Sequence, residues 1–158
     1  MPATIPVNAL LCQTDDVVLV IPTLDVYPNG FSINLAILVN PHRAQDIHQM
    51  IRGGPMVMPR VGVRFADGRV GGQSVGHGPF NLPKDAEGVP TQPFVGFAGG
   101  GGGGSGGWRF GVWVYPLPPD GPLEIFVALP PPASVEASTT VDGSAIQAAA
   151  DRASVIWQ

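Results

Sequence analysis

The sequence predicts a mainly β fold, an antiparallel two-sheet sandwich of about seven or eight short strands with a short mid-chain helix and a C-terminal helix. Several apolar stretches alternate with period two, and turns rich in glycine and proline separate them. Hydrophobic residues make up 44% of the chain and charged residues 13%, whereas a disordered chain combines low hydrophobicity with high charge. The 22 glycines and 18 prolines among 158 residues therefore indicate the turns of a folded domain, with a small barrel as the alternative to a sandwich.

The clearest element is a hairpin, which a predicted strand at residues 5–11 precedes. Residues 17–27 are apolar and β-branched, and a Pro-Asn-Gly turn joins them to residues 31–39. An alternating pattern beside a glycine turn is typical of a half-buried antiparallel pair. The side chains predicted to face the core in the second arm are Phe31, Ile33, Leu35, Ile37 and Val39.

Two further elements are predicted before the middle of the chain. Asn40 can cap a short helix in which Pro41 takes the first helical position, and Gly53 with Pro55 would end it. A second hairpin follows over residues 61–70, with an Asp-Gly turn between its arms.

Residues 71–107 are predicted to form a long loop rich in glycine, proline and phenylalanine. Its last part, residues 99–107, holds eight glycines around Ser105. Connections of this length are unusual inside a compact domain, so the loop is expected to be either functional or partly disordered.

The most aromatic element is a third predicted hairpin, over residues 108–129, whose turn is rich in proline. A last strand is predicted at residues 134–141. A helix over residues 144–157 then ends the chain, because Ser144 and Gln147 have the spacing of a capping box and an apolar stripe follows them.

Composition argues against several classes of partner. The formal net charge is −4 and the eight Lys and Arg side chains are scattered, so no nucleic-acid surface is expected. The single cysteine, Cys12, excludes an intramolecular disulfide. No basic residue precedes Arg43, and no apolar run approaches the roughly 18 residues of a membrane span. We expect a soluble, cytoplasmic protein, with no membrane partner, that folds as a single domain over residues 1–158.

Three segments are distinctive: FADGR at residues 65–69, the glycine tract, and WVYPLPPDGPL at residues 113–123. Together with the C-terminal helix they resemble a family of uncharacterised proteins of actinobacterial type. The resemblance covers most of the chain. It implies no activity, so it transfers no functional residue.

A serine-hydrolase motif, Gly-x-Ser-x-Gly, occurs twice. The match at residues 72–76 places Ser74 three residues before His77, and the other match lies in the glycine tract. A nucleophile elbow needs a helix directly after its serine, and neither match precedes a helical pattern. A serine hydrolase built on Ser74 and His77 is therefore the least favoured hypothesis, and no catalytic residue is predicted.

No metal site or cofactor is predicted either. His42 and Asp46 would share a helix face while His48 would point elsewhere, and a metal site needs three or four converging ligands. The adjacent Asp15 and Asp16 would diverge, which argues against an acid–base pair. The glycine tract lacks the Lys-Ser or Lys-Thr that follows the glycines of a phosphate-binding loop.

Arg109, Trp113 and Tyr115 are the candidate binding residues, because they alternate onto the side of their strand opposite the predicted core row. Trp and Tyr side chains can stack on a sugar ring or another planar ligand, and Trp, Tyr and Arg also dominate the energetics of protein interfaces. The alternative is that the terminal helix or the phenylalanine-rich loop covers this face.

The favoured hypothesis is a non-catalytic β-sandwich protein that forms a homo-oligomer or docks on a protein partner. Apolar side chains lie opposite the core rows at Leu38, Trp113, Tyr115 and Phe126, and the charge density is low. Large exposed apolar patches usually mark interfaces. A carbohydrate or small-ligand binding module that uses the aromatic face is the alternative.

Overall fold

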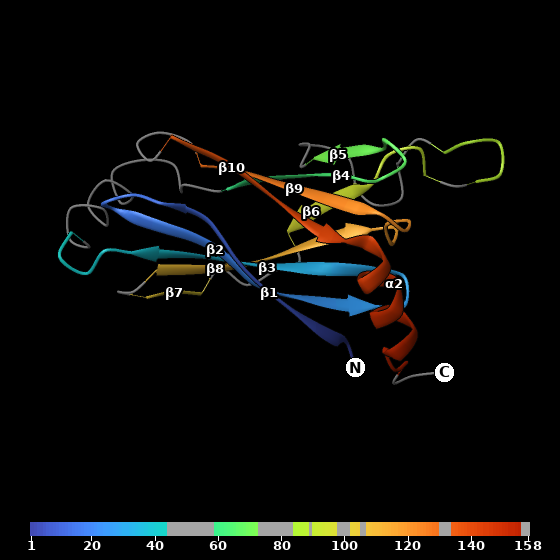
Figure 1. Cartoon of the computed structure of the whole chain (residues 1–158), viewed down its shortest axis with the longest axis horizontal. Helices are drawn as coiled ribbons and strands as arrows, with labels where there is room; N and C mark the ends of the chain where they lie inside the picture. Colours follow the sequence, from blue (N-terminus) through green and yellow to red (C-terminus); the bar gives the residue numbers. More distant parts are fainter. Residues whose placement is uncertain are drawn as a thin grey trace.

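The computed structural model describes residues 1–43, 59–72, 84–88, 90–97, 102–104, 107–129 and 134–155. These residues form ten strands and one helix, α2. Every ladder between the described strands is antiparallel. The predicted antiparallel two-sheet sandwich is confirmed, and Figure 1 shows the two sheets as layers. The two strands that were not predicted, Phe94–Phe97 and Gly102–Gly104, are short segments of four and three residues.

Sheet A contains six of the described strands and begins with an N-terminal meander. The strand order is β1-β2-β3-β8-β6, and β7 pairs with β8 on the edge that β6 also occupies. The bounds of these strands are Ala3–Gln13 for β1, Val17–Tyr27 for β2, Gly30–Val39 for β3, Phe94–Phe97 for β6, Gly102–Gly104 for β7 and Gly107–Tyr115 for β8.

Sheet B contains the other four described strands, in the order β10-β9-β4-β5. The second predicted hairpin is present as β4 and β5, and a further hairpin joins β9 to β10. The bounds are Arg60–Arg64 for β4, Val70–Gly72 for β5, Pro122–Leu129 for β9 and Val135–Asp142 for β10.

The inner faces of the two sheets pack into one apolar core, and the alternation predicted from the sequence decides which side chains enter it. Val112 and Val114 of β8, with Leu123 and Ile125 of β9, are completely buried. In β3 the predicted core row is buried throughout: Phe31, Ile33, Leu35, Ile37 and Val39.

Four outer strands, β1 and β6 of sheet A and β10 and β5 of sheet B, each have a neighbour in the other sheet. β1 lies beside β10, and β5 lies beside β6. At the second junction Gly71 has no space for a Cβ atom, because the carbonyl group of Pro93 occupies the position. Since free strand edges are the usual sites of edge-to-edge association, this arrangement leaves the two outer faces as the main surfaces for contact with other molecules.

Pro22 lies in the middle of β2, although β2 has a strand on each side. Proline donates no backbone hydrogen bond, so inside a sheet it occurs at edges or bulges. The register of β2 shifts at this position against both β1 and β3, and Asn8 of β1 adopts a φ of 51° in the bulge. The bulge takes up this extra residue, so the apolar side chains of β2 on both sides of Pro22 stay on the core face: Val17, Leu19, Ile21, Leu24 and Val26.

The third predicted hairpin is wrong in its pairing, although its two strands are present. β8 pairs with β3, β6 and β7 of sheet A, and β9 pairs with β4 and β10 of sheet B. Residues 116–121 therefore cross from one sheet to the other, and they follow a cis peptide bond between Tyr115 and Pro116. Pro118 is buried in this crossing, and Leu117 packs against the core.

The predicted loop over residues 71–107 contains two strands of sheet A, so this prediction needs correction. β6 is formed by a Phe-Val-Gly-Phe segment, and β7 lies within the glycine tract, where Gly103 is the partner of Trp108. Glycines have no side chains that could hold this part of the tract in place, so its backbone is held by hydrogen bonds to the backbone of β8. The predicted mid-chain helix falls largely on residues 44–58, and Ser74 and His77 on residues 73–83, all outside the described residues.

Helix α2 spans Gly143–Arg152 and lies at one end of the sandwich, beside the N-terminus (Figure 1). Its N-cap is Asp142, whose carboxylate accepts a hydrogen bond from the backbone N–H of Ser144. The predicted Ser144 cap is therefore wrong, and Gln147 donates to the carbonyl oxygen of Pro118 instead of closing a capping box. The helix also ends earlier than predicted, because Ala153 is already extended.

Candidate functional site

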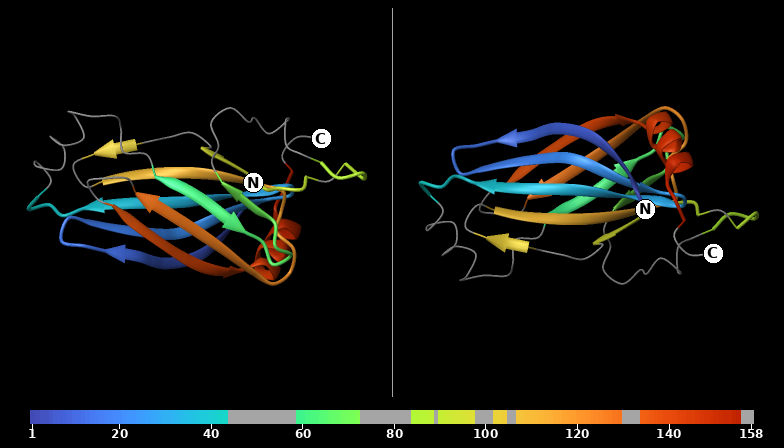
Figure 2. Two further views of the ribbon diagram at one scale, coloured as in Figure 1. Left: turned by 90° about the horizontal axis from the view of Figure 1, so that it is seen from above. Right: turned by 90° about the horizontal axis from the view of Figure 1, so that it is seen from below.

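Sheet A carries very little charge. Among all six of its strands the charged side chains are Asp25 in β2 and Arg109 in β8. Both alternate away from buried neighbours and lie on the outer face, which the right-hand view of Figure 2 shows with β1, β2, β3 and β8 side by side and α2 at their end. This surface is called the outer face of sheet A below.

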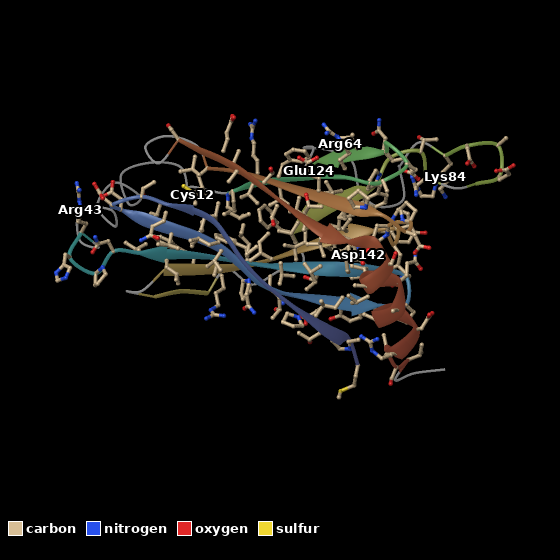
Figure 3. The ribbon with its side chains drawn as sticks, viewed as in Figure 1. Cys12, Arg43, Arg64, Lys84, Glu124 and Asp142 are labelled. Carbon is tan, nitrogen blue, oxygen red and sulfur yellow. The ribbon has the colours of Figure 1, made fainter. Side chains whose placement is uncertain are left out.

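The outer face of sheet B carries more charged side chains. Arg64 and Glu124 form an ion pair there with 3.3 Å between Nη1 and Oε2, and Figure 3 shows both side chains on that side of the sheet. The guanidinium of Arg64 also lies 5.3 Å from the ring centroid of Phe126. A shallow depression of about 550 Å³ on the same face has Arg60 and Glu136 in its lining. Charged side chains are therefore fewer on sheet A than on sheet B, although sheet A has more strands.

One end of the outer face of sheet A is apolar. Leu10 of β1 stands opposite Val20 of β2, and Val18 of β2 stands opposite Leu38 of β3. The side chain of Leu10 is 60% exposed and that of Leu38 is 45% exposed. These four residues, Leu10, Val18, Val20 and Leu38, are called the apolar patch.

A polar band crosses the middle of the same face. The carboxylate of Asp25 accepts hydrogen bonds from Thr4 Oγ1 at 2.8 Å and from Asn34 Nδ2 at 3.0 Å. Asn34 Nδ2 also donates to Thr23 Oγ1 at 2.8 Å. The band therefore joins β1, β2 and β3 by side-chain hydrogen bonds, while the negative charge of Asp25 has only neutral donors as partners in these bonds.

The other end of the face is aromatic. The rings of Trp113 and Tyr27 meet edge to face, with centroids 5.5 Å apart and an interplanar angle of 67°. The indole also lies over Gly30, where a Cβ atom would come within 2.6 Å of its Cζ2. Phe94 of β6 is the register partner of Tyr115. We call Tyr27, Phe94, Trp113 and Tyr115 the aromatic end.

The three candidate binding residues predicted from the sequence lie on this one face, but they do not converge. Trp113 and Tyr115 belong to the aromatic end and are half-buried. Arg109 is exposed and stands opposite Ala36, beside the apolar patch. Four residues of strand separate Arg109 from Trp113, which is about 13 Å. A small ligand would not reach both, whereas a broad partner surface would.

Tyr27 and Asp25 lie on the same face as Trp113, although the sequence did not predict them as binding residues. Both sit in the first hairpin, where Asp25 interrupts an apolar strand and Tyr27 ends it. The pairing of β3 with β8 brings them near Trp113, because Ser32 is the partner of Asp25 on one side and of Trp113 on the other. That pairing joins segments about 80 residues apart in the chain, so a local pattern could not reveal it.

The other candidate groups do not form a site within the described residues. Asp16 is tied to Arg43, with 2.9 Å between Oδ1 and Nε, so it joins the turn between β1 and β2 to the segment that follows β3, at the end of the sheet where Figure 3 labels Arg43. His42 is exposed, and Asp46 and His48 lie outside the described residues. In the part of the chain that the structure describes, no three His, Cys, Asp or Glu side chains lie close enough together to hold a metal ion.

Comparison of the chain with protein-family models, with curated proteins and with solved structures finds no match. The resemblance to an actinobacterial family therefore stays a prediction. None of the described helical residues forms a helix with the length and apolar character required to cross a bilayer.

Proposed function

We propose that this chain is a non-catalytic β-sandwich protein that acts by self-association or by docking on a protein partner, and that the outer face of sheet A is the contact surface. One observation carries the proposal: a sheet of six strands has two charged residues, while its outer face exposes Leu10 and Leu38. Contiguous exposed apolar surface is rare on monomeric proteins and usually marks an interface.

The size of the face fits this role. Five neighbouring strands spaced about 4.8 Å apart and nine residues long at about 3.3 Å per residue cover about 700 Å². A standard protein interface buries about 800 Å² on each partner. The arrangement of an apolar patch and an aromatic end around a hydrogen-bonded band also agrees with the mixture of apolar and polar contacts found in such interfaces.

The test is a concentration series by analytical ultracentrifugation or by size exclusion with light scattering, together with a pull-down. We expect a species larger than a monomer, or a specific partner, and we expect Leu10→Lys to remove it. Val70→Lys is the matched control, since Val70 is 52% exposed but lies in β5 of sheet B. A protein that stays monomeric at high micromolar concentration and captures no partner would refute the proposal.

A carbohydrate-binding role is the second candidate, and the aromatic end supports it. Trp113 lies in the same cross-strand row as Asp25, so a stacking ring and a carboxylate are about 10 Å apart on one surface. Intrinsic tryptophan fluorescence titrated with a panel of glycans tests this role. A response that Trp113→Phe abolishes and Trp108→Phe, on the inner row of β8, preserves would support it; the absence of any response would rule it out.

A further inference from the structure

We propose that the outer face of sheet A binds a second copy of this chain in a two-fold symmetric dimer, in which Arg109 of each copy pairs with Asp25 of the other. This inference rests on the proposed function, and it names the partner and the contacts that define the geometry.

The two charges of the face are opposite in sign and too far apart to pair within one copy. Arg109 stands in the cross-strand row of Ala36 and Val20, and Asp25 in the row of Ser32 and Trp113. The rows are four residues apart along β8, about 13 Å, and β3 separates the two strands, about 10 Å across the sheet. The direct distance is therefore about 16 Å, and the ion pairs of the described residues include neither side chain.

A two-fold interface is self-complementary, because each contact from residue i to residue j occurs twice. A face with one acid and one base satisfies this condition when the two-fold axis lies in the plane of the interface and is the perpendicular bisector of the line from Arg109 to Asp25. Both charges then meet an opposite charge, and no like charges face each other. A partner of unrelated sequence would have to supply a matching pair at the same spacing, whereas a second copy supplies it by symmetry.

The same axis brings the apolar groups against each other. On the strand spacings given above, the bisecting line passes close to Leu10, Asn34 and Trp113. Residues close to a two-fold axis contact their own counterparts, so Leu10 meets Leu10 and Trp113 meets the region around Trp113. The exposed leucine of β1 is thus covered in the dimer, and the polar bands of the two copies cross at its centre.

Charge-swapped variants test this geometry directly. Arg109→Asp leaves two acids on the face, and Asp25→Lys leaves two bases, so each variant places like charges opposite each other in its own homodimer. We expect each variant alone to dissociate at least about tenfold more readily than the wild-type chain. In an equimolar mixture both contacts become attractive, since the introduced carboxylate of one copy faces the introduced ammonium group of the other, and the native Asp25 and Arg109 face each other. The mixture should therefore associate as tightly as the wild-type protein.

Sedimentation velocity with one variant fluorescently labelled reads out the mixed species, and circular dichroism verifies that both variants are folded. If Asp25→Lys does not fold because Thr4 and Asn34 lose their acceptor, Asp25→Asn, which keeps an acceptor and removes the charge, should still weaken self-association. Dimers of wild-type strength in every charge variant would overturn this geometry, while loss of the dimer in Leu10→Lys would leave the proposed function intact. A monomeric wild-type chain would overturn the geometry, and it would overturn the proposed function as well if the pull-down captured no partner.

Discussion

The indole of Trp113 lies over Gly30, in the space that a side chain at residue 30 would occupy. A Cβ atom on Gly30 would approach both Trp113 Cζ2 and the carbonyl oxygen of Val114 to 2.6 Å. The glycine is therefore required by packing on the outer face, in addition to its place next to the turn between β2 and β3.

Replacing Gly30 with alanine should displace the indole and destabilise the protein. Overpacking of this kind costs about 1–3 kcal/mol in free energy of unfolding, which urea denaturation measures, and the emission maximum of tryptophan should shift. Gly72→Ala is the control, because the nearest atom to its Cβ would be 4.0 Å away. Equal stability of the two variants would contradict the placement of Trp113.

Pro22 gives a second prediction, because it is the extra residue that the bulge of β2 accommodates. Deleting Pro22 would restore regular alternation, in which Leu24 and Val26 still face the core in phase with Ile21. We expect the deletion variant to keep a cooperative thermal transition. Pro22→Ala keeps the residue count and the bulge, so it should also unfold cooperatively, with a loss of at most about 1 kcal/mol. Loss of the cooperative transition in the deletion variant would contradict this phase relationship.

Sequence patterns predicted which side chains of a strand are buried, but they did not predict which strands pair. Alternation predicted the buried rows of β3, β8 and β9, because period two is a property of each strand by itself. Strand partners depend on contacts between distant segments, so the joining of β8 to β3 and the crossing at residues 116–121 were missed. The sequence did predict that Trp113 and Tyr115 face outward, but the grouping with Tyr27 and Asp25 exists only after the sheet has formed.

The N-cap of α2 supplies a third prediction, because the sequence predicts Ser144 as the cap and the structure has Asp142 there. The carboxylate of Asp142 accepts the backbone N–H of Ser144 at 2.9 Å. Asp142→Ala should therefore lower the free energy of unfolding by about 0.5–2 kcal/mol. Ser144 is exposed, so Ser144→Ala should change it by at most about 0.5 kcal/mol. Thermal unfolding of both variants measures the two losses of stability. A larger loss in Ser144→Ala than in Asp142→Ala would favour the capping box predicted from the sequence over the Asp142 cap.

The fourth prediction concerns Gly107, the residue at which the glycine tract enters β8. Its φ is +137°, and a Cβ atom there would collide with the carbonyl oxygen of Ile37 in the neighbouring strand β3. Gly68 is the matched comparison, because its φ is +91° and nothing lies within 4 Å of its Cβ position. Gly68→Ala should cost only the backbone strain of a left-handed residue, about 1–2 kcal/mol.

Gly107→Ala carries a comparable strain and must also push β3 and β8 apart. We therefore expect the larger loss in free energy of unfolding at Gly107, together with faster amide hydrogen exchange at Ile37 and Leu38 in the adjoining ladder. Urea denaturation and hydrogen exchange measured on both variants test this expectation. If Gly107→Ala were no more destabilising than Gly68→Ala, β3 could not approach β8 as closely at this residue as the structure places it.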